Sequence, residues 1–128
     1  MKTSTGPPIL IIDDDPMLRL VCKTRLTQDG FAVETANSGI KGLEMARERR
    51  YRLILLDLYM PEYSGLDFLR DVEGLLGSTP VIVLSAAEKD AIARRCFELG
   101  ATRFLIKPVP ARVLSAEVQQ VLAGSRPS

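Results

Sequence analysis

Five short runs rich in apolar residues recur along the chain, and each is followed by a segment whose apolar residues repeat with helical spacing. Runs that are apolar on both faces are typical of strands buried in a parallel sheet, whereas an alternating run is typical of an edge strand. The predicted strands are residues 9–12, 31–36 (the alternating one), 53–57, 80–86 and 102–106, and the predicted helices are residues 16–29, 39–50, 65–76, 88–99 and 111–122. This alternation predicts a doubly wound α/β fold, (βα)5, with a five-stranded parallel sheet and right-handed crossovers.

Capping signals set the beginnings of three predicted helices. Asp15 followed by Pro16 is typical of an N-cap and a first helical residue. Ser38 and Ser64 occupy the N-cap position of the second and third helices. The residues expected to face the core from the first two helices are Leu18, Val21, Cys22 and Leu26, and Ile40, Leu43 and Ala46.

Length and composition fit a single domain. The chain has 128 residues, of which 46% are apolar, and this is enough to bury one core. We expect residues 1–8 to be a disordered leader, residues 9–122 the domain, and residues 123–128 a tail or truncated linker. No apolar run approaches the roughly 20 residues of a membrane-spanning helix, so we expect a soluble, cytoplasmic protein with no membrane contact.

Charge and missing residue types exclude several classes of function. The formal net charge of +1 argues against direct nucleic-acid binding, which needs a basic excess along one face. The chain has no histidine, which excludes histidine metal sites, Ser-His-Asp catalysis and phosphohistidine chemistry within it. Cys22 and Cys96 lack metal-ligand spacing and are expected to be free, buried thiols. No glycine-rich phosphate loop is present, so nucleotide binding is not expected.

Polar side chains follow four of the predicted strands at the points where the strands end. Asp57 ends the most apolar strand, and by itself it is open to two interpretations, a functional residue or the start of a turn. In a parallel sheet all carboxyl ends open on one edge, where α/β folds bind ligands. That edge would also receive Asp13, Asp14, Ser85 and Lys107. Polar groups at four strand ends favour a functional site.

Three carboxylates at one edge repel each other. The repulsion is relieved either by a raised pKa or by a bound cation. A site made only of oxygen ligands, with an open face for phosphate, suits Mg2+. The sequence therefore predicts a magnesium site at this edge of the sheet.

Four motifs stand at these strand ends. They are Ile-Ile-Asp13-Asp14-Asp15-Pro16, Leu-Leu-Asp57-Leu-Tyr59-Met60-Pro61 with Gly65, Val-Leu-Ser85-Ala86, and Phe104-Leu-Ile-Lys107-Pro108. Together they closely resemble the receiver domain of bacterial two-component response regulators, over about residues 9–122. The resemblance implies the flavodoxin-like strand order 2-1-3-4-5.

The resemblance implies a role for each residue of the site. Asp57 accepts a phosphoryl group from a phosphohistidine on a sensor histidine kinase or a histidine phosphotransfer protein. Asp14 and Asp57 hold Mg2+ directly, together with the backbone carbonyl of Tyr59, and Asp13 does so through a water. Lys107 and the metal neutralise charge on the transferring group, where most of the catalysis lies.

The resemblance also implies a conformational switch. Ser85 hydrogen-bonds a phosphoryl oxygen and pulls its loop toward the site, which frees space for the ring of Phe104 to turn inward. The movement remodels the surface of the fourth helix, fifth strand and fifth helix, where a downstream effector domain or protein binds. Alternatively, Phe104 is a half-buried strand aromatic with no switching role. The Lys107-Pro108 bond is expected to be cis.

Two departures from the family pattern affect these expectations. Tyr59 and Ala87 occupy positions that flank the water attacking the acyl phosphate, and the bulky ring of Tyr59 predicts slow self-dephosphorylation. The segment before Phe104 lacks the acidic pair of the winged-helix transcription-factor subfamily, so a monomer and a phosphorylation-dependent dimer both stay open. The surface of the fourth helix, fifth strand and fifth helix would carry four arginines, which are Arg94, Arg95, Arg103 and Arg112. Either they make this surface basic for an acidic partner, or they are solvated surface charges with no partner role.

Two other functions compete with this interpretation. A haloacid-dehalogenase-type phosphatase also uses a strand-end aspartate with Mg2+, but its general acid is an aspartate two residues on, where this chain has Tyr59. The second is a receiver-like scaffold that binds partners without phosphorylation, and the presence of all the expected polar groups argues against it. We therefore expect a signalling domain that assists only its own phosphotransfer and autodephosphorylation, and not an enzyme.

Overall fold

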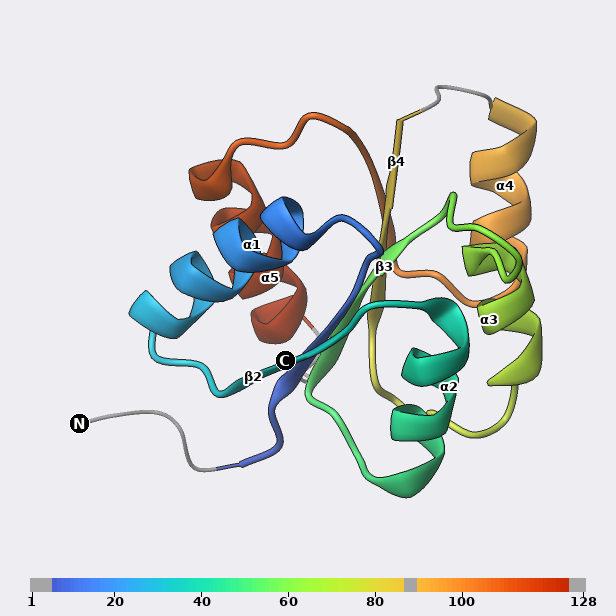
Figure 1. Ribbon diagram of the computed structural model, residues 1–128, viewed down its shortest axis with the longest axis horizontal. Helices are drawn as coiled ribbons and strands as arrows, with labels where there is room; N and C mark the ends of the chain where they lie inside the picture. Colours follow the sequence, from blue (N-terminus) through green and yellow to red (C-terminus); the bar gives the residue numbers. More distant parts are fainter. Residues whose placement is uncertain (1–5, 87–89, 125–128) are drawn as a thin grey trace.

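The computed structural model describes residues 6–86 and 90–124 (Figure 1). Within them, five parallel strands form one sheet in the order β2-β1-β3-β4-β5. The strands are β1 (Ile9–Ile12), β2 (Val33–Ala36), β3 (Leu53–Asp57), β4 (Val81–Ser85) and β5 (Arg103–Ile106). The helices are α1 (Pro16–Gln28), α2 (Gly39–Glu48), α3 (Gly65–Asp71), α4 (Asp90–Glu98) and α5 (Ala111–Gly124). The predicted (βα)5 architecture and strand order are confirmed.

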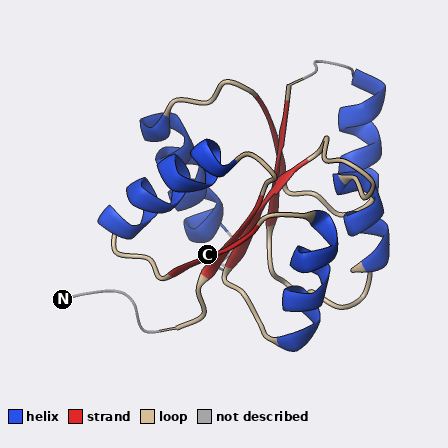
Figure 2. Ribbon diagram, in the orientation of Figure 1, coloured by secondary structure: helices blue, strands red, loops and turns tan. Residues whose placement is uncertain are grey.

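Helices cover both faces of the sheet. α1 and α5 lie on one face, and α2, α3 and α4 lie on the other (Figures 1 and 2). Because successive strand residues point to opposite faces, Ile9 and Ile11 enter the core under α1 and α5, and Leu10 and Ile12 enter the core under the other three helices. Every residue of β1, β3 and β4 is buried, as expected for the central strands of a covered parallel sheet.

Each of the two cores contains one free cysteine. Cys22 belongs to the core under α1 and α5, and Cys96 belongs to the core under α2, α3 and α4. The prediction of free, buried thiols is confirmed. Burial raises the pKa of both thiols, that of Cys22 to about 11, so both are protonated at neutral pH.

The predicted N-caps are present. The Asp15 side chain accepts a hydrogen bond from the backbone N of Met17 (2.9 Å), and Ser38 Oγ accepts one from the backbone N of Lys41 (3.1 Å). Ser64 forms a reciprocal capping box with a side chain of the first turn of α3. These local hydrogen bonds explain why the helices begin where the sequence predicts.

The third helix is shorter than predicted. α3 ends at Asp71, whereas the pattern predicts an end near residue 76. After the helix the chain continues in turns, in which Gly74 (φ +82°) and Gly77 (φ +61°) adopt left-handed backbone conformations that glycine accepts without steric cost. The apolar residues of this segment follow a turn and not a helix.

Other element ends differ from the prediction by one or two residues. α2 ends at Glu48 because Arg49 is extended (φ −154°), and α5 continues to Gly124, beyond the predicted end at 122. The strand ladders begin at Val33 and Arg103. The predicted start of the fourth helix at residue 88 lies outside the described residues. No helix within the described ranges is long and apolar enough to cross a membrane.

Two residues predicted to face the core are exposed. Val21 of α1 is 44% exposed and Ile40 of α2 is 49% exposed. The core-facing line of α1 runs through Cys22 and Leu26, and at 100° per residue Val21 lies about 100° around the helix from Cys22 and about 140° from Leu26. Ile40 is displaced in the same way from the buried line of α2. The buried stripe of each helix is therefore narrower than its apolar pattern.

Part of the predicted leader is held against the sheet. The backbone N of Arg52 donates to the carbonyl of Pro8 (2.8 Å), and its Nε donates to the carbonyl of Pro7 (3.2 Å). Residues 1–5 lie outside the described residues, so the disorder of the leader and the outer domain limits stay predictions.

Candidate functional site

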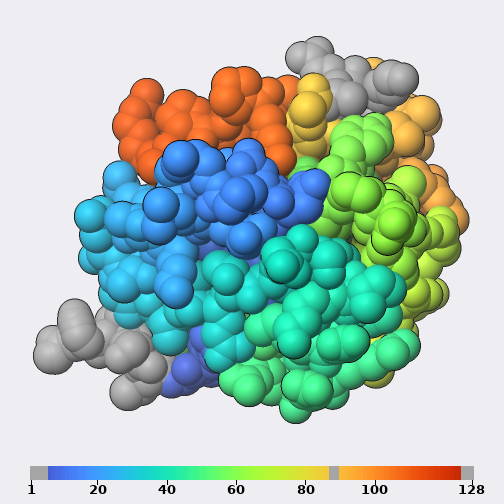
Figure 3. Space-filling model, viewed as in Figure 1, coloured from blue at the N-terminus to red at the C-terminus, as the bar shows by residue number. Residues whose placement is uncertain are grey.

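The carboxyl ends of β1 and β3 place two aspartates side by side. Ile12 pairs with Leu56, so Asp13 and Asp57 occupy equivalent positions one residue later in neighbouring strands. The segments that follow β1, β3 and β5 are far apart in sequence but lie next to one another in the upper half of the molecule in the views of Figures 1 and 3. The edge that the strand pattern predicts therefore exists.

Three carboxylates form a cluster at this edge. One oxygen from each of Asp13, Asp14 and Asp57 lies within 4.8 Å of the others. Asp13 and Asp57 are buried, with 1% and 4% of their surface exposed, and Asp14 is exposed. The cluster is therefore a partly sunken group of oxygen donors with one side open to solvent, as the sequence predicts.

A lysine from the end of β5 reaches the two buried carboxylates. Lys107 Nζ lies 3.0 Å from Asp57 Oδ1 and 3.3 Å from Asp13 Oδ2. Its backbone N donates to the carbonyl of Ser85 (2.7 Å), which ties the segment after β5 to the end of β4. The Lys107-Pro108 peptide bond is cis, as expected.

Burial opposes the ionisation of the two inner carboxylates. It raises the pKa of Asp57 to about 6, and the neighbouring charge of Asp13 adds to the effect, while Lys107 counteracts it. The pKa of Asp13 is also raised by burial, against the hydrogen bond from the Asp15 backbone and the charge of Lys107. Burial alone would lower the pKa of Lys107, but its contacts with Asp57 and Asp13 raise it overall. Two carboxylates face one ammonium group, so the pocket favours additional positive charge.

The other predicted residues lie around this cluster. Ser85 is fully buried at the end of β4. Tyr59 is 49% exposed, two residues after Asp57 in the loop that follows β3. Phe104, in the edge strand β5, pairs with Val83, is half-buried, and packs on the core under α2, α3 and α4. Ala87, the second residue expected to flank the attacking water, lies outside the described residues.

The structure adds a residue that sequence reasoning missed. Arg19, in the first turns of α1, donates through Nη1 to the backbone carbonyl of Asp13 (2.8 Å). The backbone N of Asp15 donates to Asp13 Oδ1 (2.9 Å). These two hydrogen bonds fix the turn that carries Asp13 and Asp14. An arginine among the polar residues of an amphipathic helix gives no sequence signal for this contact.

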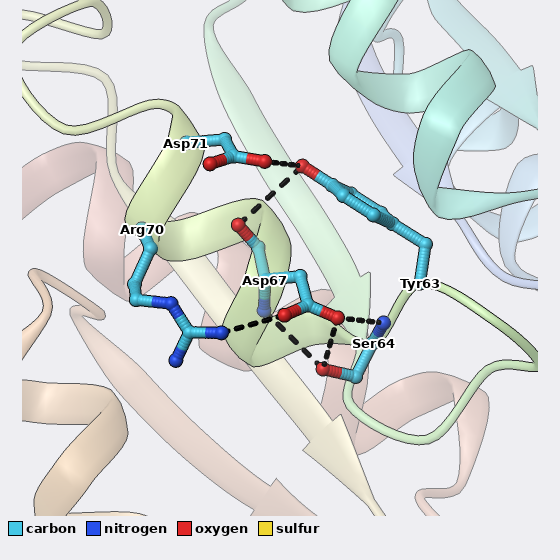
Figure 4. A network of polar contacts seen from close by, with 5 residues as sticks. All are labelled: Tyr63, Ser64, Asp67, Arg70 and Asp71. Atoms are coloured by element: carbon cyan, nitrogen blue, oxygen red, sulfur yellow. Dashed lines mark hydrogen bonds and ion pairs between the residues drawn. The ribbon is translucent and has the colours of Figure 1, made fainter.

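A second missed feature is a polar network beside the loop that follows β3 (Figure 4). The Asp67 carboxylate accepts hydrogen bonds from the backbone N of Ser64 (2.9 Å) and from Arg70 Nη2 (2.6 Å). The Tyr63 hydroxyl donates to the Asp71 carboxylate. Burial and this hydrogen bond raise the pKa of Tyr63. The spacing of Ser64 and Asp67 is a recognisable capping-box signal, but the role of Tyr63 depends on the folded chain.

A (βα)5 sheet with an acidic cluster and a lysine at its carboxyl edge defines a class of α/β domains that can hold a divalent cation and a phosphoryl group side by side. Sequence comparison agrees with this class. The profile of the response regulator receiver domain matches residues 9–119. The chain belongs to this family, the receiver domains of two-component response regulators.

Curated relatives and solved structures give the same result. The chain is 37% identical to the transcriptional regulatory protein AfsQ1 of Streptomyces coelicolor, and the match covers 95% of this chain and 54% of AfsQ1. It is also 37% identical to the CpxR homolog of Haemophilus influenzae, with 91% of this chain and 51% of that protein covered. It therefore spans about half the length of these relatives. A CheY-like receiver domain from Methanospirillum hungatei superimposes with a TM-score of 0.90 at 25% identity, covering 94% of this chain and 97% of that one. The receiver domain of a Syntrophus aciditrophicus histidine kinase gives 0.84 at 30% identity, covering 96% and 95%.

Proposed function

We propose that Asp57 is the phosphoacceptor of this receiver domain and that Asp13, Asp14 and the Tyr59 carbonyl complete a Mg2+ site beside it. The observation that carries the proposal is the position of Asp57, a buried strand-end carboxylate that lies 3.0 Å from the Lys107 ammonium and within 4.8 Å of two other carboxylates. Buried charged groups in such an arrangement are typical of functional sites.

The residues present fit a magnesium ion. The donors are all oxygens, which Mg2+ prefers, and one side of the cluster opens to solvent, where waters and phosphate oxygens complete the coordination. Burial raises the pKa of both Asp13 and Asp57, so a cation beside them would favour their ionised forms. A bound Mg2+ would supply positive charge beside these carboxylates and would stabilise the phosphoryl oxygens during transfer.

The chain's own residues then act as follows. A carboxylate oxygen of Asp57 attacks the phosphorus of a phosphohistidine, a P–O bond forms, and the P–N bond to the imidazole breaks, so Asp57 becomes an acyl phosphate. Before transfer the Lys107 ammonium group contacts Asp57, and during transfer it contacts a phosphoryl oxygen and neutralises part of its charge. The Ser85 hydroxyl donates a hydrogen bond to another phosphoryl oxygen. The same groups assist the later hydrolysis of the acyl phosphate.

The donor would be a sensor histidine kinase or a histidine phosphotransfer protein, because the chain has no histidine of its own. The output would pass through Phe104 to the surface of α4, β5 and α5, where an effector domain or protein binds, in a monomer or a phosphorylation-dependent dimer. Arg95 and Arg103 of this surface already form ion pairs, with Glu98 (3.3 Å) and Glu117 (3.5 Å). This weakens the alternative of a basic face for an acidic partner.

The test is intact mass after incubation of the chain with Mg2+ and acetyl phosphate. We expect a single phosphate adduct that disappears with a chelator and in Asp57→Ala. Asp90→Asn, which changes an exposed carboxylate of α4, is the matched control and should be phosphorylated like the parent. A folded parent that takes no phosphate from any donor would instead support the scaffold that binds partners without phosphorylation.

A further inference from the structure

The loop between β3 and α3 is closed at its base. The backbone N of Gly65 donates to the carbonyl of Leu58 (2.8 Å), which joins the two ends of residues 59–64. Glycine is required at the closing position, because a Cβ on Gly65 would lie 2.9 Å from the carbonyl oxygen of Asp57 and from the Cα of Leu58. The start of α3 therefore lies directly against the backbone of Asp57, and the conformation of the loop decides where the Tyr59 carbonyl lies.

Within the loop, the backbone adopts a tight turn. Glu62 has a φ of +69°, a left-handed conformation that is uncommon for a residue other than glycine. The backbone N of Tyr63 donates to the carbonyl of Pro61 (2.7 Å), which closes a three-residue turn. Such conformations persist when the surrounding structure holds them.

Tyr63 holds this turn against two helices. Its hydroxyl donates to the carboxylate of Asp71 at the end of α3 and lies 3.4 Å from the carbonyl oxygen of Asp67 (Figure 4). On the other side Tyr63 packs against Gly39 at the start of α2, where a Cβ would come within 2.5 Å of its Cδ2 and 2.7 Å of its carbonyl oxygen. Its ring also packs on the core under α2, α3 and α4. Both the side chain and the backbone of Tyr63 are therefore fixed.

We propose that Tyr63 is a positioning residue for the metal site, because it anchors the turn that follows Tyr59 and so holds the carbonyl-bearing loop in place before Mg2+ binds. This inference rests on the proposed function, in which the Tyr59 carbonyl is a ligand. The physical reason is preorganisation, since a loop that is already ordered loses less conformational entropy when the ion binds. Removing such outer supports of metal ligands weakens binding by roughly 10- to 100-fold.

The test measures Mg2+ affinity of the whole chain by isothermal titration calorimetry, together with the Mg2+ dependence of phosphorylation by acetyl phosphate. In Tyr63→Ala we expect the Kd for Mg2+ to rise about tenfold. The Mg2+ concentration for half-maximal phosphorylation should rise with it, while the rate at saturating Mg2+ stays close to that of the parent. Tyr63→Phe keeps the ring against Gly39 and should restore the Kd to within about threefold of the parent value.

Two further variants separate positioning from general loss of stability. Gly39→Ala keeps the tyrosine at position 63 but pushes it out of place, because the added Cβ would clash with its ring. This variant should also raise the Kd for Mg2+, and it tests the positioning role if Tyr63→Ala is too unstable to study. Leu99→Ala removes a half-buried side chain that packs on the same core from the turn after α4, and should lower the melting temperature without changing the Kd.

The outcomes are distinct. Tyr63→Ala and Gly39→Ala that both bind Mg2+ within twofold of the parent would overturn the positioning role while leaving the proposed function intact. A folded parent that binds no Mg2+ would overturn both.

Discussion

Asp57 is a buried carboxylate next to a second buried carboxylate, and its pKa near 6 shows how strongly the folded chain opposes its ionisation. Lys107 offsets only part of the rise in the pKa of Asp57, because its single ammonium group contacts both Asp57 and Asp13. The residue that we propose as phosphoacceptor is therefore also a source of instability in the metal-free chain.

Replacing Asp57 by Asn should stabilise the metal-free chain at neutral pH. The pKa of Asp57 in the folded chain, about 6, lies above the ordinary 3.8, so protonated Asp57 favours the folded state. This stabilisation is complete below about pH 4 and is lost as the pH rises through about 6. We expect Asp57→Asn to raise the free energy of unfolding by about 2 kcal/mol at pH 7.5, and by much less at pH 4.5. Urea unfolding followed by circular dichroism, with a chelator present, measures both values. An equal change at the two pH values would contradict this prediction.

Tyr59 carries a second prediction at this scale. Two residues after Asp57, its bulky ring is expected to shield the acyl phosphate from water. Tyr59→Gly should lose phosphate faster than the parent, by about tenfold, which corresponds to roughly 1.4 kcal/mol of activation free energy. Tyr59→Phe keeps the bulk of the ring and should behave like the parent. Loss of phosphate is measured by intact mass over time, and a Tyr59→Gly rate no higher than that of the parent would remove the shielding role.

At the scale of elements, the segment after α3 contains a glycine whose effect on stability depends on backbone conformation alone. Gly74 has a φ of +82°, and a Cβ at this position would meet no atom within 4 Å. Gly74→Ala should therefore lower the free energy of unfolding by about 1 kcal/mol through backbone strain alone. Gly124→Ala is the matched control, because that glycine is also uncrowded but lies in α5 without a positive φ. Chemical denaturation of both variants checks this, and an equal effect would exclude backbone strain as the cause.

The strands and helix beginnings were predictable because their signals are local. Continuous apolar runs identify buried strands, and Asp15, Ser38 and Ser64 cap the helices with their own side chains. The early end of α3 was missed because a glycine within an apolar pattern does not reveal the sign of its φ. Val21 was misassigned because the apolar pattern of α1 is wider than the stripe that the sheet covers.

The site was predictable to the extent that strand ends determine it. Asp13, Asp14, Asp57 and Lys107 meet because parallel strands end at one edge, which follows from the order of strands and helices along the chain. The contacts that hold this edge in place depend on distances across the fold. The hydrogen bond from Arg19 to the Asp13 carbonyl and the anchoring of Tyr63 belong to this second kind.

At the scale of the whole molecule, binding of Mg2+ should be coupled to folding. An ion that binds only the folded state stabilises it by about 2.7 kcal/mol when its concentration is a hundred times its Kd. We expect the melting temperature to rise with Mg2+ and to fall back when a chelator is added. Asp14→Asn should lose most of this response, whereas Asp90→Asn should keep it. A melting temperature independent of Mg2+ in the parent would argue against the magnesium site.

The chain also spans only about half the length of the curated relatives it matches. Those relatives are named as transcriptional regulatory proteins, and the family places this chain in the part that receives the signal.

The placement of the two cysteines makes each layer of the molecule separately observable. Cys22 and Cys96 lie on opposite sides of the sheet, and the chain has no other cysteine. A thiol-labelling reagent can reach each one only when its own layer opens, so the labelling rate at Cys22 follows the opening of α1 and α5, and the rate at Cys96 follows the opening of α2, α3 and α4. Peptide mass mapping of the labelled chain, before and after phosphorylation, would then show which side of the sheet loosens when the signal arrives.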